Sequence, residues 1–159
     1  MIALIPMDLP NLRRLAASEP TELPAAEGAL PPAHVAARAL SQLEAGVPAE
    51  WCVPFLVVAN ESGQILGGCR FKGTPVDGRV EIGYGVAKAA RRRGIATAAV
   101  TQLLRLAASS GMVRHLDAHI LPDNIASSAV VSRLGFTRMG IVVDPDGERV
   151  VHWTYPVST

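Results

Sequence analysis

The sequence predicts an α/β (α+β) domain built on a mixed β-sheet. Three β-rich runs at residues 53–60, 64–73 and 78–87 are separated by the turn-forming segments ESG and TPVDG, which indicates an antiparallel meander. The third run leads directly into a long apolar-faced helix near residues 95–109. Strand and helix patterns then alternate, giving the order β-α-α-β-β-β-α-β-α-β-β.

The segments before the meander read as a strand and two helices. Residues 1–6 form a short apolar run that Pro6 closes, as an edge strand would be. Residues 9–17 have helical spacing with Asp8 as N-cap, and residues 31–45 have it with proline in the first turn. Between them lies a proline-rich loop, residues 19–32. Two interpretations of this loop stay open: a movable border of a substrate site, or a passive connection.

The segments after the long helix are bounded by equally clear signals. Gly111 is a C-cap candidate, and Asp123 or Asn124 caps a helix that Gly135 ends. The turn DPDG joins the last two strands as a hairpin. The predicted elements are strand 115–121, helix 125–134, and strands 136–143 and 148–156.

The bulk composition describes one globular domain, residues 1–159. Apolar residues make up 49% and charged residues 18% of the chain, which argues against a disordered protein. The net charge of +1 argues against nucleic acid or an anionic membrane as a partner. No run reaches the roughly 18–20 apolar residues that span a bilayer, and MIALIPMDLP lacks the pattern of a signal peptide. We therefore expect a cytoplasmic protein, with Cys52 and Cys69 as reduced apolar fillers.

The long helix begins with an unusually basic loop. No acidic residue occurs between Glu81 and Asp117, yet six cationic residues do: Lys88, Arg91, Arg92, Arg93, Arg105 and Arg114. Arginines at a helix start oppose the helix dipole, each costing about 0.3–1 kcal/mol, so an external anion is expected there. Gly94 and Ala96 keep the first turn slim enough for backbone amides to reach a diphosphate. The alternative is a solvated charge cluster.

Two common phosphate-binding motifs do not fit this loop. The P-loop pattern GxxxxGK[ST] is absent, and Gly83-Tyr84-Gly85 lacks the third glycine of a dinucleotide-binding fingerprint. Asp117 lies at a suitable distance downstream for a ribose-binding acid, but it falls in mid-strand. Dinucleotide binding is therefore the weakest of the interpretations.

Two motifs carry a family resemblance. Arg91-x-x-Gly94-x-Ala96 after a strand resembles the acetyl-CoA diphosphate loop of the GNAT N-acetyltransferase superfamily. Residues 121–136, LPDNIASSAVVSRLGF, and the preceding EIGYGV resemble the branch that contains ribosomal-protein N-terminal (alanine) acetyltransferases. Together the matching segments cover about residues 80–136, and before residue 50 only the order of elements agrees.

The resemblance implies a fold and a cofactor site. It implies a mostly antiparallel central sheet with two splayed parallel strands, residues 80–87 and 115–121, flanked by about four helices. Acetyl-CoA would lie in the splay as co-substrate, and no metal is implied. The implied cofactor-binding residues are Gly85, Val86, Ala87, Arg91, Arg92, Arg93, Gly94, Ile95, Ala96, Thr97, Asn124, Ser127 and Ser128.

Acyl transfer to an amine also requires a proton acceptor, because most alkyl amines are protonated at neutral pH. Two candidates compete, Glu81 on the strand that ends at the cofactor and His119 five residues before Asn124. Each has a structural alternative: Glu81 pairs with an arginine or caps the meander edge, and His119 is a hydrogen-bonded sheet residue. Many family members place a tyrosine at the position of Val131 to protonate the leaving thiolate. Its absence leaves this part to Ser127, Ser128 or water, or the thiolate leaves unaided.

The resulting prediction is an acetyl-CoA-dependent N-acetyltransferase acting by direct transfer in a ternary complex. The acceptor is a primary amine, either a protein N-terminus or a small molecule. The main alternative is a non-catalytic acyl-CoA-binding or sensing module of the same fold. A homodimer is left open.

Overall fold

The computed structural model describes residues 1–157 and confirms the predicted α+β class. The strands within these residues are Ile2–Pro6 (β1), Phe55–Ala59 (β2), Ile65–Phe71 (β3), Arg79–Val86 (β4), His115–Ile120 (β5), Thr137–Val143 (β6) and Arg149–Pro156 (β7). The α-helices are Leu9–Ala16 (α1), Ala33–Glu44 (α2), Ile95–Ser110 (α3) and Ile125–Leu134 (α4). Two short 3-10 helices, Ala49–Trp51 (η1) and Lys88–Ala90 (η2), were not predicted.

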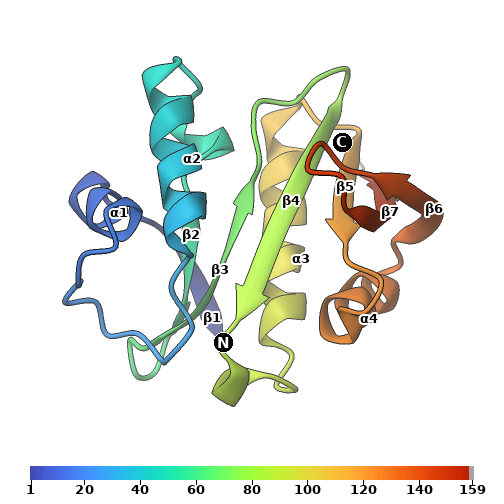
Figure 1. The fold of residues 1–159 in the computed structure, drawn as a ribbon. Coiled ribbons are helices and arrows are strands. Elements are labelled where there is room, and N and C mark those ends of the chain that lie inside the picture. Colours follow the sequence, from blue (N-terminus) through green and yellow to red (C-terminus); the bar gives the residue numbers. More distant parts are fainter. Residues whose placement is uncertain (158–159) are drawn as a thin grey trace.

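All the strands belong to one sheet, in the order β1-β2-β3-β4-β5-β7-β6 (Figure 1). Neighbouring strands are antiparallel except β4 and β5, which run parallel. These two strands pair only between residues 79–81 and 115–117, and beyond them they separate. The splayed parallel pair that the resemblance implied is therefore present, and β1 is an edge strand as predicted.

The helices begin and end where local signals indicated. Asp8 caps α1 by accepting a hydrogen bond from the N–H of Asn11 at 2.8 Å. Of the two candidates for α4, Asn124 is the cap, and its side chain accepts from the N–H of Ser127. Helix α3 lies between two left-handed glycines, Gly94 at φ 73° and Gly111 at φ 71°. These ends fix α3 between the basic loop and the start of β5.

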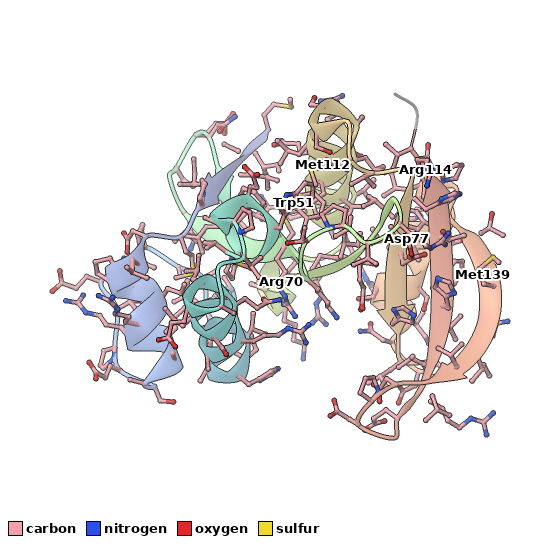
Figure 2. The ribbon with its side chains drawn as sticks, turned by 90° about the horizontal axis from the view of Figure 1, so that it is seen from above. Trp51, Arg70, Asp77, Met112, Arg114 and Met139 are labelled. Carbon is pink, nitrogen blue, oxygen red and sulfur yellow. The ribbon has the colours of Figure 1, made fainter. Side chains whose placement is uncertain are left out.

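Helices cover both faces of the sheet (Figure 2). Helix α3 packs against β1, β3 and β4, and α4 lies beside α3. Helix α2 lies on the opposite side, where its Gln42 side chain donates to the carbonyl of Lys72 at 3.1 Å. Apolar side chains on the inner face of α3, including the fully buried Val100 and Leu103, form part of the core. Within the described residues, no helix combines the length and the apolar character that crossing a membrane requires.

The proline-rich loop at residues 19–32 is anchored at its middle to β3. Ala26 donates its N–H to the carbonyl of Ile65 at 2.9 Å, and Ile65 donates to the carbonyl of Pro24 at 2.8 Å. Ala29 is buried in the core cluster. The end of the loop is thereby held against the same strand that carries Cys69 and Arg70.

Candidate active site

The separation of β4 from β5 opens a cavity of about 980 Å³. That volume is of the size that small-molecule and cofactor sites usually have. Its walls come from the end of the proline-rich loop, from β3 and β4, from the basic loop and from α4. The lining residues include 28–32, 68–70, 83–86, 90–92, 94–97 and 124–127, with Arg133 further along α4.

The basic loop gives this cavity an electropositive end. The first N–H groups of a helix have no intrahelical partners, and α3 has neither a side-chain cap nor an acidic residue in its first turn to bind them. Ile95, Ala96 and Thr97 carry three of those groups and line the cavity. Arg92 adopts φ 65°, an uncommon conformation for a residue with a side chain. This loop and the helix start together form a site suited to a diphosphate.

Space at Gly94 fits a ligand there. A Cβ built on Gly94 meets no atom within 4 Å, so the position faces open space rather than protein. Gly94 lines the cavity together with Arg91 and Arg92, whereas Arg93 is exposed and does not line it. Arg91 donates from Nε to the carbonyl of Val86 at 3.3 Å, which ties the loop to the end of β4.

The start of α4 forms the wall across the cavity from β4. The side-chain oxygen of Asn124 accepts a hydrogen bond from the N–H of Ser127 at 3.1 Å, which leaves the amide NH₂ as a donor. Tyr84 of β4 reaches across and donates its hydroxyl to the carbonyl of Ser127 at 2.7 Å. Ser127 lines the cavity and Ser128 does not. Burial raises the pKa of Tyr84 well above its ordinary value, so its phenol is neutral.

The two proton-acceptor candidates lie in contact with each other. Oε2 of Glu81 lies 3.3 Å from Nδ1 of His119 and 2.9 Å from Nζ of Lys72. The side chains of Glu81 and His119 remain 32% and 30% exposed, so both can reach solvent or a substrate. Glu81 is thus paired, but with a lysine and a histidine rather than with an arginine.

A second carboxylate, that of Asp117, is linked to this pair through His152. The ring of His119 stacks on the ring of His152, with centroids 4.8 Å apart and planes 12° apart. Nε2 of His152 lies 2.8 Å from Oδ1 of Asp117, and because an ionised carboxylate only accepts hydrogen bonds, Nε2 carries the proton. Arg79 binds both oxygens of Asp117, at 2.9 and 3.0 Å. The stacked ring of His119 is therefore held by a fixed neighbour.

The hydrogen bonds to Asp117 also change the pKa of its carboxyl group. Burial alone would raise the pKa of this carboxyl, but hydrogen bonds from Arg79, His152 and Thr154 outweigh burial and lower it. Asp117 is therefore ionised throughout the physiological range.

The predicted site residues fall into two groups. Most of the implied cofactor residues line one cavity, but Ala87 is buried in the core and, like Arg93 and Ser128, does not line it. Glu81 and His119 are not among the lining residues either; Glu81 is the last residue of β4 that pairs with β5, and His119 lies on β5 two residues past that pairing. Gly83, two residues after Glu81, does line the cavity. Glu81 is therefore adjacent to the cofactor cavity along β4, and His119 contacts Glu81 from β5.

Three residues near the cavity were not singled out from the sequence. His152 was given no role, yet the register of β5 and β7 sets it directly opposite His119. Tyr84 was noticed only as part of a motif, and Arg70 was not noticed at all. The alternation of side chains along β3 and β4 would have placed Arg70 and Glu81 on the polar face of the sheet. It would not have identified the residues that contact them from other strands, because these depend on the register between strands.

Comparisons with known proteins agree with this architecture. Residues 3–137 match the acetyltransferase (GNAT) domain family. The chain is 29% identical over 102 residues to the uncharacterized N-acetyltransferase YjdG of Bacillus subtilis (strain 168), covering 64% of this chain and 58% of that protein. The uncharacterized N-acetyltransferase p20 of Bacillus licheniformis is 28% identical over 91 residues, covering 57% of this chain and 51% of that protein. The alignments thus span little more than half the length of either relative.

Solved structures extend the likeness over the whole fold. RimL, a ribosomal alpha-N-protein acetyltransferase, has a TM-score of 0.70 at 18% identity, covering 99% of this chain and 94% of that one. The aminoglycoside acetyltransferase AAC(6')-Ib in complex with coenzyme A has a TM-score of 0.71 at 20% identity, covering 98% and 95%. At such identities the likeness establishes the fold. Since the family match also spans most of the sequence, the chain belongs to the GNAT family of acetyltransferases.

Proposed function

We propose that this protein transfers the acetyl group of acetyl-CoA to a primary amine by direct attack in a ternary complex. One observation carries the proposal: the parting of β4 from β5 leads straight to the uncapped start of α3. A diphosphate at that helix start and an acyl arm along β4 fit one continuous cavity. Acetyl-CoA supplies the activated acetyl thioester.

Holding the co-substrate falls to backbone groups and arginines. Amides 94–97 bind the diphosphate, with Arg91 and Arg92 beside it. Gly85 and Val86 offer backbone groups to the arm, since β4 has left β5 at this point. Asn124 contributes its free NH₂, and Ser127 contributes its hydroxyl.

Glu81 and His119 act as one proton-accepting unit. The amine nitrogen attacks the thioester carbon, the C–S bond breaks, and the proton lost by the amine passes to this pair directly or through water. His119 is a neutral acceptor when unprotonated, and Glu81 stabilises the cation that then forms. The Asp117–His152 pair behind it fixes the ring, which is a positioning role.

Helix α4 offers no tyrosine to protonate the leaving thiolate, because the position where many family members have one is occupied by the fully buried Val131. Ser127, Ser128 or water protonates it, or it leaves as the thiolate. Of the two serines, Ser127 lines the cavity and is the better candidate. Tyr84 orients the start of α4 through the Ser127 carbonyl.

Two acceptor classes come from the names of structural neighbours, a ribosomal protein N-terminus and an aminoglycoside. The sequence motifs are compatible with either. The rival function, a non-catalytic acyl-CoA sensor, is favoured only by the apolar Val131 in place of the family's tyrosine.

A thiol-release assay separates these functions. Acetyl-CoA is mixed with the protein and a panel of amines and peptides, and free CoA thiol is followed while calorimetry measures CoA binding. Amine-dependent thiol release supports the enzyme. Tight CoA binding with no turnover for any amine supports the sensor, and NAD binding that CoA does not compete would favour a dinucleotide site instead.

The sequence left a homodimer open, and we propose β6 as the strand at which a second copy would pair. This edge strand exposes Met139, Ile141 and Val143, and Figure 2 shows Met139 at the outer side of the sheet. An exposed apolar edge strand is a ready template for another strand. Light scattering over a range of concentrations tests this, and a monomer throughout would contradict it.

A further inference from the structure

Arg70 places a cation in the cavity wall, and among residues 1–157 it forms no ion pair. It lies on β3, opposite Gly83 of β4, and its side chain is half-buried beside α2 (Figure 2). The ion pairs of residues 1–157 join Lys72 and His119 to Glu81, and Arg79 and His152 to Asp117, so that none involves Arg70. The described residues also give its guanidinium no side-chain hydrogen bond.

The surroundings make that charge costly. Burial lowers the pKa of Arg70, the nearby Arg38 lowers it further, and Glu81 offsets part of this. A buried arginine with a structural role normally has a carboxylate beside it, whereas Arg70 has a second cation nearby. An anion bound in the cavity would relieve both effects.

Gly83 lets Arg70 lie across β4. A Cβ built at Gly83 would come within 3.3 Å of Cζ of Arg70 and 3.1 Å of Cε of Lys72, tighter than ordinary contact. Alternate residues of a strand are about 6.6–6.8 Å apart, so the Cα atoms of Glu81 and Gly85 each lie roughly one such step from the Cα of Gly83. The guanidinium of Arg70, which lies next to Gly83, is therefore between the proposed proton acceptor and the proposed acyl arm along β4.

The proline-rich loop forms part of the cavity wall beside Arg70. Pro31 of the proline-rich loop comes within 3.8 Å of a Cβ built at Gly68, two residues before Arg70. The loop thus covers β3 next to the guanidinium, and its middle is pinned to Ile65.

We infer that Arg70 binds an oxyanion of the acceptor, which makes the acceptor a small amine carrying a carboxylate or phosphate group. This rests on the proposed function. A guanidinium offers paired N–H groups that match either oxyanion. A polycationic aminoglycoside would meet the guanidinium of Arg70 in this wall, with a second cation, Arg38, nearby.

Matched amine pairs test the inference. Thiol-release rates are compared for leucine against leucinamide and for phosphoethanolamine against ethanolamine, which distinguishes the two oxyanions. We expect at least one anionic member to be preferred, and Arg70→Gln to reduce kcat/KM for it by roughly 10- to 100-fold. Dividing the ratio within a pair for wild type by that for the variant cancels the different basicities of the amines. Arg14→Gln, an exposed change on α1, serves as control and should alter neither ratio.

The failures of the two proposals are distinguishable. Equal use of both members of each pair, with no effect of Arg70→Gln, overturns the inference while the enzyme stands. Use of acidic peptides alone, or of an aminoglycoside in preference, overturns it too. If no amine turns over, calorimetry with the CoA-loaded protein decides: an anionic amine that binds wild type but not Arg70→Gln supports the inference, and binding by none overturns it. Retained CoA affinity and an unchanged melting curve show that the variant is folded.

Discussion

Replacing Gly94 with alanine should weaken CoA binding far more than it destabilises the fold. Gly94 has φ 73°, and a Cβ added there meets no protein atom within 4 Å. The folded protein therefore bears only the strain of a left-handed alanine, roughly 1–2 kcal/mol. In the bound state the new methyl group projects into the space proposed for the diphosphate.

The far end of the same helix supplies a matched control. Gly111 has φ 71° and also meets nothing within 4 Å, but it lies at the C-terminal end of α3, away from the cavity. Both variants should lower the melting temperature by about 2–8 °C. Only Gly94→Ala should weaken CoA, by roughly 10- to 150-fold if one backbone-to-phosphate hydrogen bond is lost.

Calorimetric titration of CoA into both variants, beside their melting curves, measures the two effects separately. Equal CoA affinities for Gly94→Ala and Gly111→Ala would refute the assignment of the diphosphate to the start of α3. Unequal melting temperatures with equal affinities would show that strain, not ligand contact, distinguishes the two glycines.

Three further outcomes are expected. Glu81→Gln and His119→Ala should each lower kcat by roughly 100-fold or more while leaving CoA affinity near wild type, and the double variant should lose less than the product if they act as one unit; full additivity argues against a unit. Asp117→Asn should cost about 1–3 kcal/mol of stability at pH 7. Because the folded pKa of Asp117 is depressed, its contribution is complete above the ordinary value of about 3.9 and is lost as the pH falls through the folded value, so urea denaturation should show the gap closing in acid. Burial raises the pKa of Cys69 to about 12, so a thiol reagent at pH 8 should label it only after unfolding; rapid labelling of the native protein would contradict its buried position.

Most of the fold followed from signals that act over a few residues. Asp8 and Asn124 cap their helices through N–H groups three residues away, and Gly111 ends α3 by its own conformation. Turn-forming segments between β-rich runs predicted the meander because short connections favour antiparallel neighbours. The order of elements was predictable for these reasons, whereas the splayed pair was predicted from the family resemblance alone.

The candidate site was less accessible because its contacts cross strands. Whether His119 meets His152 depends on the register between β5 and β7, which no local pattern encodes. The choice between Glu81 and His119 had no answer in sequence because the two side chains touch. Ser127 was predicted for its hydroxyl, yet its backbone N–H and carbonyl are the groups engaged within the protein.

Only three residue pairs join β4 to β5, so the sheet consists of two halves, β1 to β4 and β5 to β7, with a short connection between them. Backbone amides that face the gap in residues 83–86 lack a ladder partner across it, and Arg79 to Asp117 is an ion pair across the remaining seam. Amide hydrogen exchange should therefore be fast along this inner edge in the free protein and slow once CoA fills the gap. Bound CoA would then act as a missing strand, joining the half that carries the basic loop to the half that carries His119.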